Sequence, residues 1–194
     1  MDNCKVVCIT GTPGVGKTTI SKLLNEKLLK KGFKSKLFFI NEIAINHDLT
    51  LGYDEEKGFN VVDINKLNKK FSEIMADENT ENEIAIVDGH LSHFCSRCDK
   101  VIVLRVKPDI LKNRLIKRNY SDNKIKDNLE SEVLAICSYE ANEFHKGKVN
   151  ELDTSDLKVS QILEICMDII QGKTYMSIGN IDFMDYFLKD NQQI

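Results

Sequence analysis

The apolar positions of this chain change their spacing repeatedly along the sequence. Short, nearly continuous apolar runs occupy residues 5–10, 36–40, 83–88, 100–106 and 148–152. Between and after these runs, apolar residues recur every three or four positions over about residues 17–31, 64–76, 108–118, 128–145 and 156–172. Strand-length runs that alternate with helical segments predict an α/β fold, in which helices flank a parallel five-stranded sheet.

The remaining segments are irregular or polar. Residues 41–48 are expected to be a short helix or irregular, residues 52–58 a polar turn, and residues 119–127 a basic loop. Residues 1–172 therefore form one expected domain, followed by a tail of residues 173–194. Apolar side chains from Ile178 to Leu188 fall at roughly helical spacing in that tail. They predict a docking helix over the core, and a partner-binding segment is the alternative.

Residues 11–18 carry the clearest chemical signal. Their sequence, Gly-Thr-Pro-Gly-Val-Gly-Lys-Thr, fits the phosphate-binding P-loop pattern, with a predicted strand before it and a predicted helix after it. The backbone N–H groups of such a loop and the following helix N-terminus bind an anion. We therefore expect ATP to contact Gly11, Gly14, Val15, Gly16, Lys17, Thr18 and Thr19. Lys17 would reach the β- and γ-phosphates, and Thr18 would hold Mg²⁺.

A second polar group follows the third predicted strand. The apolar run of residues 84–87 ends in Asp88, and His90 comes two residues later. A carboxylate at the end of a strand beside a P-loop is expected to orient Mg²⁺, here through water. His90 would position a water or polarise a phosphoryl oxygen. A hydrogen-bonded surface histidine is the alternative.

Arginine is scarce, and the four arginines (Arg97, Arg105, Arg114 and Arg118) all fall in one stretch. Arginine suits planar, bidentate recognition of phosphate. Arg114 and Arg118 are four residues apart on one predicted helix, so they share a face. Arg118 directly precedes the basic loop, and a basic loop at this position predicts a lid that closes over the triphosphate. Arg105 ends a predicted strand at the ligand-binding edge of the sheet. Solvated helix-face charges are the alternative.

Composition narrows the possible partners. Residues 100–126 hold nine basic and two acidic residues, a charge of +7. Because the net charge of the whole chain is −3, the remaining residues together carry −10. With a pI near 5.9 and no recognisable RNA-binding module, direct sequence-specific nucleic-acid binding is not expected. Apolar runs stay well short of the roughly 18 residues of a membrane span. The N-terminus is polar, unlike a signal peptide.

The six cysteines are scattered, which predicts reduced thiols in a cytoplasmic protein, or a nuclear one in a eukaryote. His90, His93, Cys95 and Cys98 have the residue types of a zinc site, so metal binding there is a minor alternative to a simple connecting segment.

Together these motifs resemble the adenylate kinase-like ATPases linked to small-subunit ribosome assembly, including archaeal putative adenylate kinases. The matching stretches are residues 10–19, 52–56, 88–90, 103–105 and 118–120, with Lys124 and Asn128 after them. The resemblance implies a P-loop, nucleoside-monophosphate kinase-like fold. Its monophosphate-binding insert would span about residues 40–61 and its lid about residues 117–127. Candidate acceptor contacts are Glu42, Tyr53, Asp54, Glu55 and Arg105.

The resemblance also implies an activity and a partner. It implies transfer of the γ-phosphoryl group of ATP to AMP, giving two ADP, together with ATP hydrolysis. The partner would be the small-subunit ribosomal protein uS11, with a role in maturing rRNA. The catalytic candidates are Lys17, Asp88, His90 and Arg118. Thr18 and Asp88 would hold Mg²⁺.

The chain departs from the family pattern in two places. Residues 41–46 contain no arginine for an acceptor phosphate, and Asn119 stands where a glycine is common. These departures leave two alternatives open. One is an ATPase switch that captures and releases uS11 with little true kinase activity. The other is a kinase for a different small metabolite.

Overall fold

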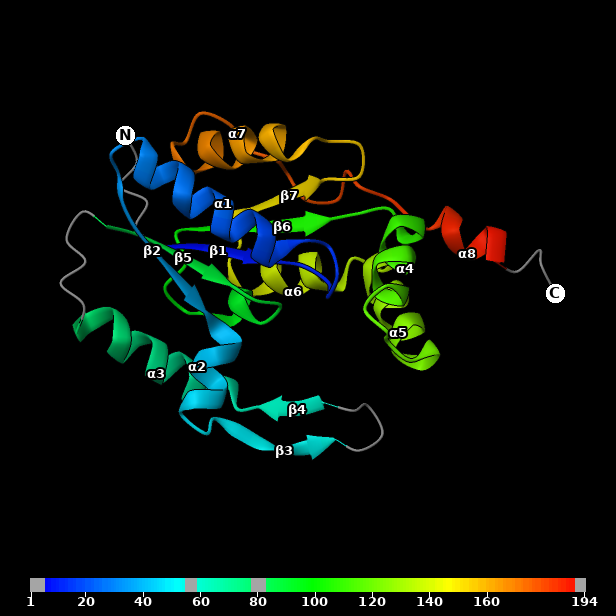
Figure 1. The fold of residues 1–194 in the computed structure, drawn as a ribbon, viewed down its shortest axis with the longest axis horizontal. Coiled ribbons are helices and arrows are strands. Elements are labelled where there is room, and N and C mark those ends of the chain that lie inside the picture. Colours follow the sequence, from blue (N-terminus) through cyan, green and yellow to red (C-terminus); the bar gives the residue numbers. More distant parts are fainter. Residues whose placement is uncertain (1–5, 55–58, 78–82, 191–194) are drawn as a thin grey trace.

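Five parallel strands form the centre of the molecule (Figure 1). The computed structural model describes residues 6–54, 59–77 and 83–190. The strands are β1 (Val6–Thr10), β2 (Lys34–Phe39), β5 (Glu83–Asp88), β6 (Lys100–Arg105) and β7 (Val149–Asp153), and they lie in the order β2-β5-β1-β6-β7. The predicted parallel five-stranded sheet is confirmed.

Helices cover both faces of this sheet. On one face lie α1 (Lys17–Lys30) and α7 (Val159–Ile170), and on the other lie α2 (Ile40–Asn46), α3 (Ile64–Asp77) and α6 (Ile136–Phe144). A separate antiparallel hairpin consists of β3 (Thr50–Asp54) and β4 (Phe59–Val62). It projects from the body, and α4 (Pro108–Ile116) and α5 (Asp122–Val133) lie together beyond the carboxyl ends of the central strands (Figure 1).

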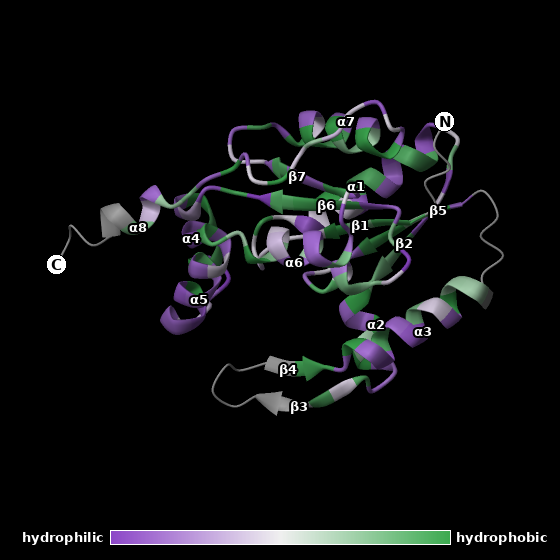
Figure 2. Ribbon diagram, turned by 180° about the vertical axis from the view of Figure 1, so that it is seen from behind, coloured by the Kyte–Doolittle hydropathy of each residue, from purple (hydrophilic) through white to green (hydrophobic). Residues whose placement is uncertain are grey.

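The central strands are buried on both faces, as parallel strands usually are. In β1, Val7 and Ile9 join one hydrophobic cluster with α1, α4 and α7, whereas Val6 and Cys8 join a second cluster with α3 and α6. Successive side chains of a strand point to opposite faces, so one strand serves two cores. Figure 2 shows the hydrophobic strands between the helical layers.

The basic segment differs from its prediction. Residues 119–127 were expected to form a loop, but α5 begins within them at Asp122, and the Ser121 hydroxyl accepts a hydrogen bond from the Lys124 N–H at 3.4 Å. The long helix expected after that loop is interrupted at Ala135, whose φ of +53° separates α5 from α6. Helix α5 contains few apolar residues, so its first half was predicted as a loop.

The tail docks largely without helical structure. Within the described part of the tail, which ends at residue 190, only α8 (Asp185–Asp190) is helical, and residues 173–184 run as non-helical chain beside β7. The Glu151 N–H donates to the Met176 carbonyl at 2.9 Å, and the Met176 N–H donates to Asn150 Oδ1 at 3.0 Å. Hydrogen bonds from β7, together with core contacts of Met176 and Ile178, therefore hold part of the segment that was expected to dock through a helical face.

The cysteine prediction needs a correction. Cys8 of β1 and Cys98, just before β6, form a disulfide, because adjacent strands bring them together. Cys95, Cys137 and Cys166 are free. Among the described helices, none is both long enough and apolar enough to cross a membrane.

Candidate active site

The glycine-rich loop joins the end of β1 to the start of α1. Gly11, Gly14 and Gly16 have φ values of +133°, +99° and +114°, which favour glycine. A Cβ atom on Gly11 would lie 2.4 Å from the Leu104 carbonyl oxygen, and one on Gly14 would lie 2.8 Å from Leu111 Cδ1. The loop therefore has its shape because β6 and α4 pack directly against its backbone.

Lys17 lies at the centre of the loop. Its Nζ donates hydrogen bonds to the carbonyl oxygens of Gly11 at 2.7 Å and Thr12 at 3.0 Å. Burial lowers the pKa of Lys17 to about 8, although the charge of Asp88 opposes this shift. A polyphosphate beside Nζ would stabilise the charged ammonium. Lys17 is thus placed and charged to bind phosphate.

Thr18 and Asp88 meet beside this lysine. Asp88 ends β5, opposite Ile9 of β1, and its side chain is buried. The Thr18 hydroxyl donates to Asp88 Oδ2 at 2.7 Å, and the Ser21 hydroxyl donates to Asp88 Oδ1 at 3.1 Å. These hard oxygen atoms suit Mg²⁺, which usually takes one or two protein ligands and completes its shell with water and phosphate. Ser21 was missed, although it lies one helical turn after Thr18.

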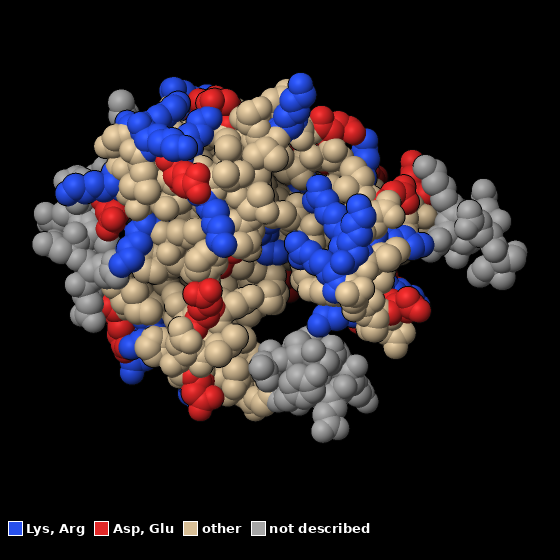
Figure 3. Space-filling model, viewed as in Figure 1, with Lys and Arg blue, Asp and Glu red and all other residues tan. Residues whose placement is uncertain are grey.

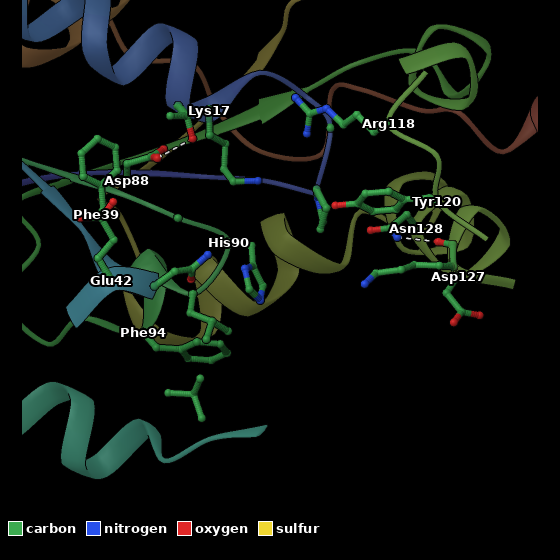
Figure 4. A pocket seen from close by; sticks show the side chains of 18 of the residues that line it. Lys17, Phe39, Glu42, Asp88, His90, Phe94, Arg118, Tyr120, Asp127 and Asn128 are labelled. Atoms are coloured by element: carbon green, nitrogen blue, oxygen red, sulfur yellow. Dashed lines mark hydrogen bonds between the residues drawn. The ribbon is translucent and has the colours of Figure 1, made fainter. Parts of the chain in front are cut away.

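These residues open onto a cleft of about 890 Å³ (Figure 4). We call its two sides the hairpin half and the α5 half. The hairpin half is lined by Phe39, Asn41, Glu42, Val61, Val62, Ile64 and Phe94. The α5 half is lined by Arg118, Tyr120, Lys124, Asp127 and Asn128. Lys17, Thr18, Asp88 and His90 lie between the two halves.

The α5 half is basic, and Figure 3 shows Lys and Arg gathered around α4 beside the hollow. Arg118 also lines a smaller depression with Gly14, Gly16, Lys17, Thr18 and Thr19. Arg114 has a different position, because its Nη1 donates to the Val15 carbonyl at 2.9 Å. Arg118 is therefore available to a ligand on the loop, whereas Arg114 holds the loop itself.

The hairpin half combines apolar walls with a few polar groups. Glu42, Phe39 and Phe94 lie around it in Figure 4. The ammonium of Lys22 lies 5.6 Å from the centre of the Phe39 ring and supplies a positive charge here. The sequence analysis missed Lys22 and Phe94. Lys22 follows Thr18 by four residues, a spacing that places both on one face of α1.

His90 faces the cleft from the segment after β5 (Figure 4). Enclosure by the protein, and then the nearby charge of Lys17, lower the pKa of His90 to about 4. The imidazole is therefore neutral near pH 7 and can donate one hydrogen bond and accept another.

Three acceptor candidates lie in or next to the hairpin turn. The backbones of Tyr53 and Asp54 belong to β3, but their side chains are not among those described, and Glu55 lies outside the described residues. Arg105 requires a correction. Its side chain is 1% exposed and pairs with Glu132 and Glu151, and it does not line the cleft. Its charge is used inside the fold, so it is not an acceptor contact.

Two of the four residues of the zinc alternative have other partners. Nδ1 of His93 lies 2.7 Å from the Thr10 hydroxyl, and Cys98 is bonded to Cys8. In the described part of the chain, no group of three or more His, Cys, Asp or Glu side chains could hold a metal ion.

The parallel sheet, the glycine-rich loop and Asp88 define a P-loop kinase-like protein. Shikimate kinase from Bacteroides thetaiotaomicron shares this fold, with a TM-score of 0.54 and 19% identity over 86% of this chain and 98% of that one. Residues 7–135 match the family model described as an AAA domain.

Relatives with higher sequence identity define the family more narrowly. The chain is 36% identical to the putative adenylate kinase of Methanothermobacter thermautotrophicus, over 94% of this chain and 99% of that protein. It is 39% identical to the putative adenylate kinase of Methanococcus maripaludis, over 94% of this chain and 97% of that protein. The chain belongs to this family of putative adenylate kinases, which confirms that part of the resemblance.

Proposed function

We propose that this protein is a nucleoside-monophosphate kinase that transfers the γ-phosphoryl group of ATP to AMP. One observation carries the proposal: a single cleft has a phosphate loop at its centre and a separate half on either side. In this assignment ATP lies along the loop with the α5 half as its lid, and the monophosphate occupies the hairpin half. The names of the curated relatives support a nucleotide kinase.

Each central side chain has a role in this proposal. Lys17 binds the β- and γ-phosphates, and Arg118 neutralises charge on the transferring group from the lid side. Thr18 and Asp88 would hold Mg²⁺, which would supply positive charge to neutralise the phosphates. His90 donates a hydrogen bond to a phosphoryl oxygen, or binds a water molecule so that it cannot attack the γ-phosphorus in line.

The chemical step needs little else from the protein. An oxygen of the acceptor phosphate attacks the γ-phosphorus, and the bond to the β,γ-bridging oxygen breaks, leaving ADP on the loop. The acceptor phosphate is already anionic, so no general base is required. Positioning and electrostatic stabilisation provide most of the catalysis in such transfers.

An acceptor panel tests this proposal. Purified protein with MgATP would be supplied with AMP, CMP, GMP, UMP or shikimate, and the phosphorylated product identified by mass. We expect AMP to give the highest kcat/KM, and Asp88→Asn to reduce it by at least ~100-fold, since charge stabilisation is usually the largest catalytic term. Phosphorylation of shikimate alone would contradict the proposal.

A second candidate is an ATPase switch that captures and releases ribosomal protein uS11 during small-subunit rRNA maturation. The hairpin half favours this candidate because it offers little to bind an acceptor phosphate. Residues 41–46 contain no arginine, and Glu42 places a carboxylate there. The charge of −10 outside residues 100–126 would suit a basic protein partner. Phosphate release from ATP that needs no AMP and changes on addition of uS11 would favour this candidate.

A further inference from the structure

A buried cluster of charges connects the phosphate loop to the C-terminal tail. It consists of Arg105 on β6, Glu132 on α5 and Glu151 on β7, all at most 3% exposed. None of the three lines the cleft. The cluster therefore has a role other than direct contact with a ligand.

Glu132 is the member that reaches the loop. Its Oε2 accepts a hydrogen bond from the Thr12 hydroxyl, and Thr12 is itself 1% exposed. Its other oxygen, Oε1, accepts from Arg105 Nε at 2.9 Å and from the Val106 N–H at 3.0 Å. One carboxylate thus joins the phosphate loop, the end of β6 and helix α5.

Thr12 in turn fixes the position of the lysine. The Thr12 carbonyl accepts from Lys17 Nζ at 3.0 Å and from the Val15 N–H at 3.3 Å. The direction of that carbonyl depends on how Thr12 is oriented, and the Glu132 bond restrains its side chain. Glu132 also lies one helical turn from Asn128, which lines the α5 half of the cleft.

The tail completes the cluster at its far end. Glu151 Oε1 pairs with Arg105 Nη1 and accepts from the Ser138 hydroxyl at 2.6 Å, and Glu151 Oε2 accepts from the Gly179 N–H at 2.9 Å. The Phe183 ring lies 5.2 Å from the Arg105 guanidinium carbon. The tail therefore excludes water from a buried cluster with two carboxylates and one guanidinium.

We propose that Glu132 is a positioning residue of the phosphate loop, acting through Thr12, and that tail residues 176–183 are needed for this role because they close the charge cluster. The inference rests on the proposed nucleotide binding and assigns it a support outside the cleft. Burying charges is costly unless all are paired, so losing one partner disturbs the others. A disturbance at the tail is thereby transmitted to Thr12.

The first test compares two variants of Thr12. Thr12→Val removes the hydroxyl at nearly constant shape, whereas Thr12→Ser keeps it. ADP binding would be measured by titration calorimetry at 20 °C, with thermal unfolding measured in parallel. We expect Thr12→Val and Glu132→Gln to raise the Kd for ADP about tenfold, equivalent to ~1.4 kcal/mol. Thr12→Ser should stay within about twofold of the wild type.

A matched control separates positioning from general destabilisation. Ser35→Ala removes a buried hydroxyl that donates to the Ile84 carbonyl at 3.1 Å, in the same sheet but at its other edge. It should lower the unfolding midpoint without changing the Kd for ADP. If Thr12→Val and Glu132→Gln behave like this control, Glu132 is merely structural and the inference is wrong.

The tail is tested in the full-length chain. Phe183→Ala uncovers the Arg105 guanidinium, whereas Phe187→Ala removes an aromatic ring whose described ring contact is with Tyr186. We expect a several-fold rise in the Kd for ADP with Phe183→Ala only. Equal effects of both variants would refute the role of the tail. Failure of the wild type to bind ADP would refute the proposed function and this inference with it, whereas normal binding by all variants would refute the inference alone.

Discussion

Lys17 has two carbonyl oxygens of its own loop as partners, and burial lowers its pKa to about 8. The same side chain on the protein surface would stay charged far above pH 8. His93 shows the same effect: burial first, and then the neighbouring His90, lower its pKa to about 3. In both cases burial disfavours the charged form of a basic group, and each case gives a pH dependence.

Nucleotide affinity should fall as pH rises above 8. In the free protein Lys17 loses its proton through pH 8, and bound phosphates raise its pKa again, so binding above pH 8 must take up a proton. We expect the Kd for ADP to rise by up to about tenfold per pH unit between pH 8.5 and 9.5. Calorimetry in buffers of different ionisation enthalpy measures both the Kd and the proton uptake. Lys17→Met should bind weakly with no such slope, and an equal slope in that variant would exclude Lys17 as the cause.

Folding stability should fall on the acid side because of His93. An unfolded histidine takes up a proton near its ordinary pKa of 6.5, whereas the folded one resists protonation down to about pH 3. The unfolded state therefore binds more protons in this window, and stability is lost as pH decreases from 6.5. We expect a loss of up to about 2 kcal/mol between pH 7.5 and 5 from this residue, because Glu140, 3.2 Å from Nε2 of His93, would offset part of it by pairing with the charged ring. Urea unfolding would show a flatter profile for His93→Gln, while the exposed His47→Gln should retain the slope of the wild type.

At the scale of elements, the strands were predictable, but the start and the end of helix α5 were not. Each central strand is a continuous apolar run because helices cover both of its faces. Helix α5 has only Ile125, Leu129 and Val133 as apolar residues, so its first half was predicted as a polar loop and only its second half as helix. The break at Ala135 has no glycine or proline to signal it. Tertiary packing determines both where α5 begins and where the chain breaks at Ala135, and the spacing of apolar residues does not indicate either.

The loop glycines give a prediction at this scale. Gly11→Ala would place a Cβ atom 2.4 Å from the backbone oxygen of Leu104, which cannot move aside, whereas Gly32→Ala meets no atom within 4 Å. Both glycines have positive φ. We expect Gly32→Ala to cost about 1 kcal/mol of stability and Gly11→Ala at least ~3 kcal/mol, with loss of ADP binding. Urea unfolding measures the difference, and equal costs would show that the approach of β6 is not tight.

Across the whole molecule, the phosphate-binding centre was predictable, but its surroundings were not. Lys17, Thr18 and Asp88 belong to short patterns whose spacing encodes their meeting at one sheet edge. Arg105 was misassigned because the strand end predicts its position but not its two glutamate partners, 27 and 46 residues away. Neither Phe94 nor Lys22 is a defined position of a motif, although Lys22 follows Thr18 by one helical turn. Only the fold brings them to the cleft.

The proposed reaction requires that both halves of the cleft are occupied at once, so that ATP and a monophosphate react with each other. The most direct measurement follows ADP and free phosphate separately during turnover of MgATP, with and without AMP, for the wild type and Asp88→Ala. We predict two ADP per ATP consumed when AMP is present, little free phosphate, and loss of both products with Asp88→Ala. Phosphate released at the same rate with or without AMP would contradict the proposed transfer to AMP and favour an ATPase.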